Sequence, residues 1–378
     1  MKILITGGAG FIGSNLAKRL ITDGHAVTVL DSLSPQIHGN DPERTSPLYA
    51  SIRDCVRFVR GSVCDESVWK RCIPEQDVIV HLAAETGTGQ SMYEIRRYAE
   101  VNVGGTAMLL DWLSRESHQV RRVVVASSRA VYGEGKYMDA DGEVVYPQAR
   151  KVEDMRDGKF EPLCEKTGVS LKMIPTDEDS KIHPSSVYGI TKLNQEQMVM
   201  TVCPALGIEA VGLRYQNVYG PGQSLSNPYT GILSIFSTRA LNGNQIDVFE
   251  DGYESRDFVF IDDVVEATYL AVTKPRAAGK IFGIGSGVAT DVLTVANKLI
   301  EYYGVKVPVI VTGAFRVGDI RHNVADLSKA RELLDFEPKV SFGTGIKIFS
   351  DWVLSQEVAE DDYEVSIREM RERGLFSE

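Results

Sequence analysis

The chain has 378 residues, of which 43% are hydrophobic and 25% charged, and its formal net charge is −11. This length allows two or at most three domains with a full buried core, and the composition is that of an ordinary globular protein. The negative charge argues against nucleic acid or an anionic membrane as a partner, because both require a basic surface. A small anionic substrate requires only a local cluster of cations.

The cysteines and the apolar runs indicate the cellular setting. The cysteines do not have the spacing of metal ligands and cannot all pair, so we expect free thiols in a reducing compartment and no metal site. No apolar run approaches the roughly 20 residues of a membrane span, and a strand predicted at residues 3–5 leaves no room for a signal peptide. We therefore expect a cytoplasmic protein that does not enter the membrane. The five cysteines are Cys55, Cys64, Cys72, Cys164 and Cys203.

Residues 3–31 predict a nucleotide-binding turn. The apolar residues 3–5 indicate a buried strand, which ends in the run Gly7-Gly8-Ala9-Gly10-Phe11-Ile12-Gly13 at the start of a helix. Glycines at this spacing let a pyrophosphate approach backbone N–H groups and the positive end of the helix. A second strand, residues 26–30, is followed by Asp31, whose carboxylate suits the ribose hydroxyls of NAD and repels the 2′-phosphate of NADP. This stretch therefore predicts NAD as the cofactor.

The rest of the chain continues the alternation of strands and helices. Apolar, strand-like runs recur at residues 56–59, 78–82 and 123–126, separated by helix-length stretches. Such alternation is typical of an α/β fold with a doubly wound parallel sheet. Two helices with long apolar faces are expected at about 101–114 and 188–201. Residues 134–184, with many charges and scattered Gly and Pro, predict an insertion with one short hairpin around residues 144–146.

Two groups of polar residues are candidates for catalysis. Tyr188 and Lys192 lie four residues apart, on one face of a predicted helix. A nearby ammonium group is expected to lower the pKa of the phenol, so that the pair can act as a general base on an alcohol. The same spacing occurs elsewhere in the chain, but only Tyr188 opens a helix just after the sheet-forming runs. Ser127 and Ser128 follow a strand and should emerge at the carboxyl edge of the sheet, where cofactor crevices form.

These features belong to an ordered series of motifs that runs through the chain. The series consists of the glycine turn at 7–13, Asp31, His81-Leu82-Ala83-Ala84, residues 102–106, 127–133, 188–192, 213–222, and Arg256-Asp257-Phe258-Val259. Over nearly its whole length the chain resembles an extended short-chain dehydrogenase/reductase of the NAD-dependent nucleotide-sugar epimerase/dehydratase family.

The resemblance implies the domain organisation. A Rossmann domain that binds NAD is expected at 1–212, with the insertion at about 134–184 and a returning segment at about 256–284. A smaller C-terminal α/β domain that binds the nucleotide-diphosphate sugar substrate is expected at 213–255 and 285–378. The resemblance also implies a homodimer, in which the helices at 101–114 and 188–201 of two copies form a four-helix bundle.

The resemblance further implies roles for individual residues. Catalysis is assigned to Ser128, Tyr188 and Lys192, and Arg321 either joins the substrate contacts or faces solvent. Guanidinium groups suit the phosphates of the substrate, because they donate in a bidentate manner. NAD contacts are expected from Gly7, Gly10, Phe11, Ile12, Gly13, Asp31, Ser62, Val63, Leu82, Ala83, Ala84, Asn102, Ser127, Tyr188 and Lys192. Substrate contacts are expected from Thr86, Thr88, Gln90, Ser128, Arg129, Asn217, Arg256 and Arg316.

The residues that follow Ser128 favour one reaction within the family. Dehydratases of the family carry an Asp-Glu pair there, and nucleotide-glucuronate decarboxylases carry a glutamate at the second position, whereas this chain has Arg129 and Ala130. Without that second acid and base, the expected reaction is oxidation and reduction at one carbon, which is 4-epimerisation through a 4-keto sugar. Residues 84–93 and the long insertion resemble in particular dTDP-L-rhamnose 4-epimerases, and the chain is also similar to UDP-glucose 4-epimerases. Many of these relatives have a cysteine-rich knuckle where Cys164 stands alone.

Other functions stay open at this point. A 4-ketoreductase would use the same catalytic residues, but it usually takes electrons from NADPH, which Asp31 disfavours. A 4,6-dehydratase or a decarboxylase is disfavoured by Arg129 and Ala130. A non-enzymatic NAD-sensing scaffold would be marked by loss of the tyrosine or the lysine, and both are present. The base of the nucleotide and the identity of the sugar are left undetermined between dTDP- and UDP-linked hexoses.

Overall fold

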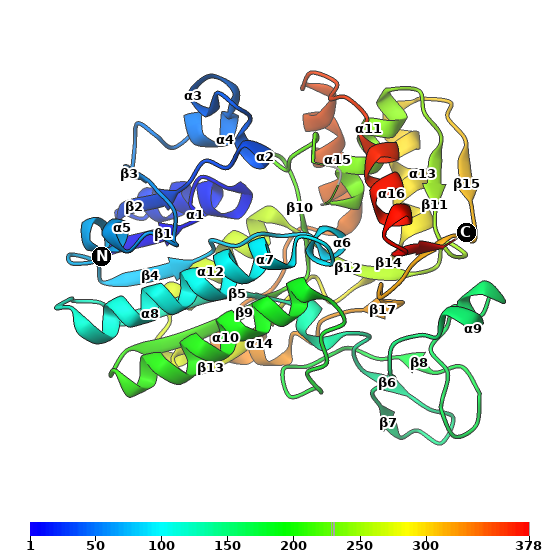
Figure 1. Ribbon diagram of the computed structural model, residues 1–378, viewed down its shortest axis with the longest axis horizontal. Coiled ribbons are helices and arrows are strands. Elements are labelled where there is room, and N and C mark those ends of the chain that lie inside the picture. Colours follow the sequence, from blue (N-terminus) through cyan, green and yellow to red (C-terminus); the bar gives the residue numbers. More distant parts are fainter. Residues whose placement is uncertain (228, 230, 378) are drawn as a thin grey trace.

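A seven-stranded parallel sheet forms the centre of the N-terminal half (Figure 1). The computed structural model describes residues 1–227, 229 and 231–377. The strand order is β13-β9-β5-β4-β1-β2-β3, and the order reverses direction between β1 and β4, as in a doubly wound sheet. The predicted fold class is confirmed. The strands are β1 (Lys2–Thr6), β2 (Ala26–Asp31), β3 (Arg57–Arg60), β4 (Val78–His81), β5 (Arg122–Ser128), β9 (Glu209–Tyr215) and β13 (Lys280–Ile284).

Helices cover both faces of this sheet, because successive apolar residues of each strand point to opposite sides. Ile3 and Ile5 of β1 belong to one buried apolar cluster together with residues of α1 and α12, whereas Leu4 belongs to a second cluster with residues of α5, α8 and α10. Apolar strands buried on both faces explain the continuous apolar runs of the sequence. The helices are α1 (Phe11–Thr22), α5 (Glu66–Cys72), α8 (Gly105–Arg115), α10 (Val187–Ala205) and α12 (Ile261–Thr273), and a π-helical stretch (Ala99–Gly104) precedes α8.

The C-terminal half is built from smaller sheets and helices (Figure 1). Strand β12 (Ser255–Phe260) pairs with β10 (Asn217–Tyr219), β14 (Ala289–Asp291) and β17 (His322–Asn323). Strand β11 (Ile246–Val248) pairs with β15 (Val309–Val311), and β16 (Phe315–Arg316) pairs with β18 (Phe376–Ser377). The helices are α11 (Ile232–Leu241), α13 (Val292–Tyr303), α14 (Ser328–Leu334), α15 (Phe342–Leu354) and α16 (Tyr363–Glu372).

The returning segment predicted at 256–284 is split between the two halves. Helix α12 packs on α1, and β13 joins the main sheet beside β9. Strand β12, however, pairs with strands of the C-terminal half, so it carries Arg256 away from the main sheet. The domain boundaries proposed from the sequence stay a prediction.

The insertion forms a small unit below the C-terminal half in Figure 1. Its predicted hairpin is present: β6 (Tyr137–Met138) pairs antiparallel with β7 (Val144–Val145) and with β8 (Lys172–Met173), and α9 (Val152–Arg156) lies between β7 and β8 in the chain. Short helical turns complete the chain between the larger elements. They are α2 (Pro35–His38), α3 (Pro42–Thr45), α4 (Pro47–Ala50), α6 (Thr88–Ser91), α7 (Ile95–Tyr98) and two 3₁₀ turns, η2 (Arg129–Tyr132) and η3 (Pro275–Ala277).

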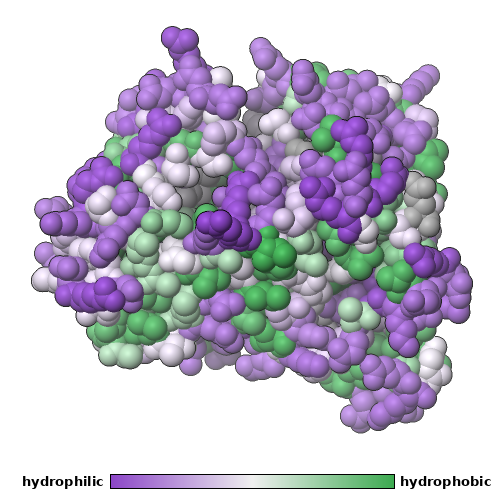
Figure 2. Space-filling view, in the orientation of Figure 1, coloured by the Kyte–Doolittle hydropathy of each residue, from purple (hydrophilic) through white to green (hydrophobic). Residues whose placement is uncertain are grey.

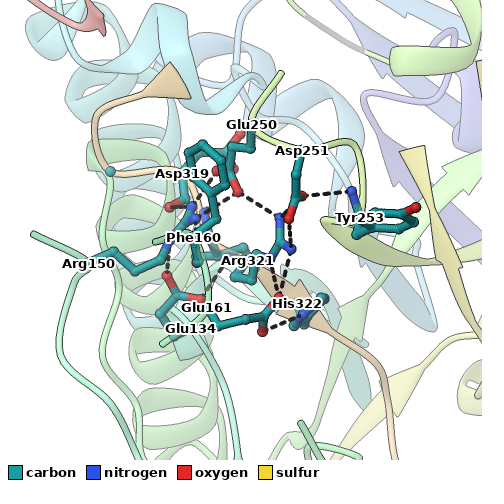
Figure 3. A network of polar contacts seen from close by, with 12 residues as sticks. Glu134, Arg150, Phe160, Glu161, Glu250, Asp251, Tyr253, Asp319, Arg321 and His322 are labelled. Atoms are coloured by element: carbon teal, nitrogen blue, oxygen red, sulfur yellow. Dashed lines mark hydrogen bonds and ion pairs between the residues drawn. The ribbon is translucent and has the colours of Figure 1, made fainter. Parts of the chain in front are cut away.

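A buried network of ion pairs ties the insertion to the C-terminal half (Figure 3). Arg150 of the insertion donates to both carboxylate oxygens of Glu250, at 2.7 and 2.8 Å, and to Glu134 at 3.1 Å. Arg321 donates to Glu250 at 3.0 Å and to Asp251 at 2.7 Å. Arg150 is thus enclosed by two buried carboxylates, of which Glu250 also pairs with Arg321. Removing Arg150 leaves Glu134 without its ion pair in a buried position.

Arg150→Ala should therefore destabilise the protein strongly, by about 3–5 kcal/mol of unfolding free energy, which is the usual cost of breaking a buried pair. The measurement is urea unfolding followed by circular dichroism. Arg331→Ala is a matched control, because Arg331 donates twice to Glu337 at the protein surface, where ion pairs contribute little. Equal effects of the two substitutions would contradict the importance given to the buried network.

Candidate active site

The glycine turn between β1 and α1 lies so close to its neighbours that side chains do not fit. Gly7 has a φ of +67°, and a Cβ atom there would lie 2.9 Å from the backbone of Ala83. A Cβ atom on Gly13 would lie 2.5 Å from the carbonyl oxygen of Gly7. The turn therefore leaves the backbone at the N-terminus of α1 open to a ligand, which is the arrangement that binds the phosphates of a dinucleotide.

A cavity of about 740 Å³ lies over this turn, at the carboxyl ends of the strands. Every residue that the sequence predicts to contact NAD, except Asn102, lines this cavity. That residue is fully buried behind the cavity: its side chain accepts from the backbone N–H of Glu85 at 2.7 Å and donates to Thr191 at 3.0 Å. Asn102 therefore joins the segment after β4 to α10. The predicted residues on the cavity are Gly7, Gly10, Phe11, Ile12, Gly13, Asp31, Ser62, Val63, Leu82, Ala83, Ala84, Ser127, Tyr188 and Lys192.

The polar groups of this cavity fit NAD. The carboxylate of Asp31 accepts from the backbone N–H groups of Ala9, at 3.0 Å, and Leu33, at 2.8 Å, which fixes it at the end of β2 beside the glycine turn. The hydroxyl of Ser127 is buried at the cavity wall and has no hydrogen-bond partner among the described residues. A fixed carboxylate for ribose hydroxyls, a free hydroxyl and an open helix N-terminus are together the groups that a dinucleotide requires.

The start of α10 brings Tyr188 to the end of β5. The hydroxyl of Ser186 accepts from the backbone N–H of Gly189 at 3.1 Å and so caps the helix. A Cβ atom on Gly189 would lie 2.5 Å from the carbonyl oxygen of Ala130, so the helix packs directly on the turn after β5. The phenol of Tyr188 lies beside the Ser128 hydroxyl, and Tyr188 and Lys192 line the large cavity. Ser128 itself lines neither cavity.

The pKa of Tyr188 differs from the expectation drawn from its spacing to Lys192. Burial raises the pKa of the phenol, and this outweighs the opposing effects of the Ser128 hydroxyl and of the charge on Arg129. The Lys192 ammonium instead donates to the side-chain oxygen of Gln195 at 2.7 Å, and burial lowers the pKa of Lys192 to about 7. The expected lowering by Lys192 is therefore wrong, because the ammonium is bound to Gln195 and desolvation of the phenol dominates.

A second cavity of about 210 Å³ lies between the two halves of the chain. In it, Arg129 donates to the side-chain oxygen of Asn217 at 2.8 Å, and Arg256 donates to the carboxylate of Asp319 at 3.1 Å. The guanidinium of Arg316 lies 4.9 Å from the ring centre of Phe249. Of the residues predicted to contact substrate, this cavity is lined by Thr88, Gln90, Arg129, Asn217, Arg256 and Arg316, whereas Thr86 lines the larger cavity.

Arg321 takes neither of the roles considered for it. It is 1% exposed and lines neither cavity. Its side chain lies in the buried network with Glu250 and Asp251. Its position five residues after Arg316 does not bring it to the same site, because the buried carboxylates hold its side chain whereas Arg316 lines the second cavity.

The C-terminal segment, residues 363–375, contributes to the wall of the second cavity. The sequence did not predict this contribution. Tyr363, Met370 and Leu375 contribute to the cavity wall. Glu369 of α16 accepts from the hydroxyls of Tyr93, at 3.0 Å, and Tyr229, at 2.8 Å, and so ties the segment to loops of both halves. The spacing of Tyr363, Ile367 and Met370 on one helix face was the available signal, but the sequence does not show what that face covers. Asp319 and Glu254 were also missed.

The family model described as the NAD dependent epimerase/dehydratase family matches residues 3–151 and 165–285. The chain belongs to this family. Residues 152–164, between the two matched segments, fall within the insertion. The prediction of NAD as the cofactor is confirmed.

Named relatives cover almost the whole chain. A dTDP-L-rhamnose 4-epimerase of Burkholderia thailandensis is 40% identical, covering 94% of this chain and 95% of the relative. A UDP-glucose 4-epimerase of Mycolicibacterium smegmatis is 31% identical, covering 92% and 96%. The crystal structure of a Thermotoga maritima UDP-glucose 4-epimerase with UDP-glucose is 30% identical, with a TM-score of 0.74, and covers 94% of this chain and 99% of that chain. In the described part of the chain, no helix is long and apolar enough to cross a membrane.

Asp31 should determine the choice of cofactor. We expect the wild-type protein to bind NAD more tightly than NADP, and Asp31→Asn to reduce this preference by about tenfold, or ~1.4 kcal/mol, because the charge that repels the 2′-phosphate is lost. Isothermal titration of cofactor-stripped protein measures both affinities. Asp23→Asn, at the exposed end of α1, is the control and should leave the preference unchanged. Tighter binding of NADP to the wild type would contradict the role of Asp31.

Proposed function

We propose that this protein is an NAD-dependent epimerase of a nucleotide-linked hexose, a dTDP- or UDP-sugar, that inverts carbon C4 through a transient 4-keto intermediate. The observation that carries the proposal is the position of Tyr188 and Lys192 at the cofactor cavity, with Ser128 beside the Tyr188 phenol and followed by Arg129 and Ala130. These residues supply one proton-transfer centre and no second acid and base. The similarity to 4-epimerases over nearly the whole chain supports the same reaction.

The residues of the two cavities have complementary roles in this mechanism. Tyr188 removes the proton of the C4 hydroxyl, and Ser128 donates a hydrogen bond to the oxygen as it becomes a carbonyl. The chemistry that bound NAD supplies is reversible transfer of the C4 hydride. Arg256 and Arg316 hold the diphosphate, with Asn217 beside them, so the keto sugar stays in the site while it turns its other face to the cofactor. Tyr188 then returns the proton to the inverted hydroxyl.

We also propose that two copies associate through α8 and α10. Figure 2 shows apolar residues gathered on the face of the molecule over these helices. Ile190 of α10 is 47% exposed, and Met108, Met198 and Val202 are partly buried beside the apolar cluster beneath them. Exposed apolar surface of this kind is typical of a contact between proteins. Pairing of both helices with those of a second copy would make the four-helix bundle expected from the family.

A panel of UDP-, dTDP-, GDP- and CDP-linked hexoses, incubated with the NAD-loaded protein, tests the reaction. We expect one dTDP- or UDP-sugar to give its C4 epimer, without net use of cofactor. Tyr188→Phe should lower the rate at least about 100-fold, the usual minimum contribution of a general base, with NAD affinity unchanged. Tyr302→Phe is the matched control, because Tyr302 also precedes a lysine by four residues but lies at the end of α13. Chromatography with mass spectrometry and proton NMR identifies the product.

Two products would contradict the proposal. A 4-keto-6-deoxy sugar would identify a dehydratase, for which Arg129 and Ala130 provide no acid and base. A reduced sugar formed with stoichiometric use of a reduced cofactor would identify a 4-ketoreductase.

A further inference from the structure

A buried carboxyl group in the second cavity has a free oxygen. Glu254 lies directly before β12 and is 7% exposed, and its side chain lines the cavity. Its backbone carbonyl accepts from the N–H of Val292 at the start of α13, which fixes the position of the residue. Within the described part of the chain, however, its buried Oε2 atom has no hydrogen-bond partner. Buried polar groups are normally satisfied, so an oxygen left free at a cavity wall points to a ligand.

The charges around Glu254 favour its neutral form. Burial raises its pKa to about 8, the charge of Arg256 on β12 opposes the rise, and the charges of Glu250 and Asp319 add to it. The guanidinium of Arg256 is already bound to Asp319 and to backbone carbonyls, including that of Ile320. At neutral pH, Glu254 therefore presents one O–H donor and one carbonyl acceptor to the cavity.

The cavity contains a second buried group without a partner. The Nε–H of Arg316 has no acceptor among the described residues. A diphosphate offers only acceptors, which suit the arginines and do not suit the acceptor of Glu254. A nucleoside offers both kinds of group, since its hydroxyls and the imide of a pyrimidine base can donate as well as accept. The free Nε–H of Arg316 thus suits the diphosphate of a nucleotide sugar, whereas the free oxygen of Glu254 suits its nucleoside.

We propose that the carboxyl group of Glu254, through its unpartnered oxygen at the cavity wall, binds a hydroxyl or imide group in the nucleoside half of the substrate. This inference rests on the proposed function, because it takes a nucleotide sugar as the ligand of the second cavity. Loss of the Glu254 proton would place a further negative charge close to the diphosphate and would also remove the O–H donor. Binding should therefore be strong below the pKa of Glu254 and should weaken as the pH rises through it.

The experiment measures substrate affinity on protein that cannot turn over. NAD-loaded Tyr188→Phe protein is titrated calorimetrically with dTDP-glucose and with UDP-glucose between pH 6.5 and 9, where the diphosphate does not change charge and the imide of the base, whose pKa is higher, keeps most of its protons. The affinity of the better ligand should be constant to about pH 8 and then fall toward tenfold per pH unit, the slope for loss of one proton. Over this range Arg129, whose pKa is lowered to about 10, stays mostly charged. Burial raises the pKa values of Tyr229 and Tyr363, so these two phenols keep their protons over the same range.

Two further substitutions in the same background isolate Glu254. Glu254→Gln keeps a donor and an acceptor without the titration, so at pH 7 its affinity should stay within about threefold of its parent's, and it should not show the tenfold fall per pH unit above pH 8. Glu254→Leu removes both groups and should weaken binding about tenfold at pH 7. Lys192, whose pKa is about 7, titrates in the cofactor cavity of all of these proteins, so its effect on the pH dependence of binding is the same in each. NAD affinity should be equal in all of them, which shows that they are folded.

The outcomes separate this inference from the proposed function. A nucleotide sugar that binds with no pH dependence above 8, or with the same dependence in Glu254→Gln, would overturn the role of Glu254 alone. The same holds if Glu254→Leu binds as tightly as its parent. Failure of every nucleotide sugar to bind a protein that still binds NAD would overturn both proposals.

Discussion

The contact between the start of α10 and the turn after β5 determines the catalytic geometry. Gly189 packs against the carbonyl of Ala130 so closely that no larger residue fits, and the Ser186 cap fixes the helix N-terminus beside it. Because this contact joins a helix to the carboxyl end of a central strand, Tyr188 and Lys192 reach the cavity in which the glycine turn presents its backbone. The same edge of the sheet thus holds the cofactor groups and the proton acceptor.

The distribution of charge explains how an acidic protein can bind an anionic substrate. Although the chain carries a formal net charge of −11, Arg129, Arg256 and Arg316 converge on one small cavity, which Asp247, Glu254 and Asp319 also line. The Nε–H of Arg316 has no acceptor among the described residues and so can donate to an anionic ligand. Arg150 of the insertion donates to the backbone carbonyl of Asp319 at 2.9 Å and so fixes the position of the segment that carries Arg316 and Asp319. The insertion therefore supports the arginine-lined cavity from a distance, in addition to stabilising the fold.

Local patterns were sufficient to predict the sheet, the glycine turn and the position of Tyr188, since each depends on residues that are close in sequence. The errors concern interactions between distant segments. The spacing of Tyr188 and Lys192 does not reveal that Gln195 binds the ammonium, and the sequence around Arg321 does not reveal the carboxylates of Glu250 and Asp251. Likewise, an amphipathic C-terminal helix is visible in the sequence, whereas the cavity that it covers is formed by residues far away in the chain. The contacts of individual residues with NAD and substrate stay predictions.

The central claim is that one hydride leaves C4 and returns to it within a single site, and isotope labelling tests this most directly. A nucleotide sugar deuterated at C4 is converted in ordinary water with added unlabelled NAD, and the epimer is examined by mass spectrometry and NMR. The account predicts that the epimer keeps its deuterium at C4, with none in solvent and none in the added cofactor. Loss of the label to water would show that a carbon-bound proton is exchanged by a base, which would contradict the mechanism built on Tyr188.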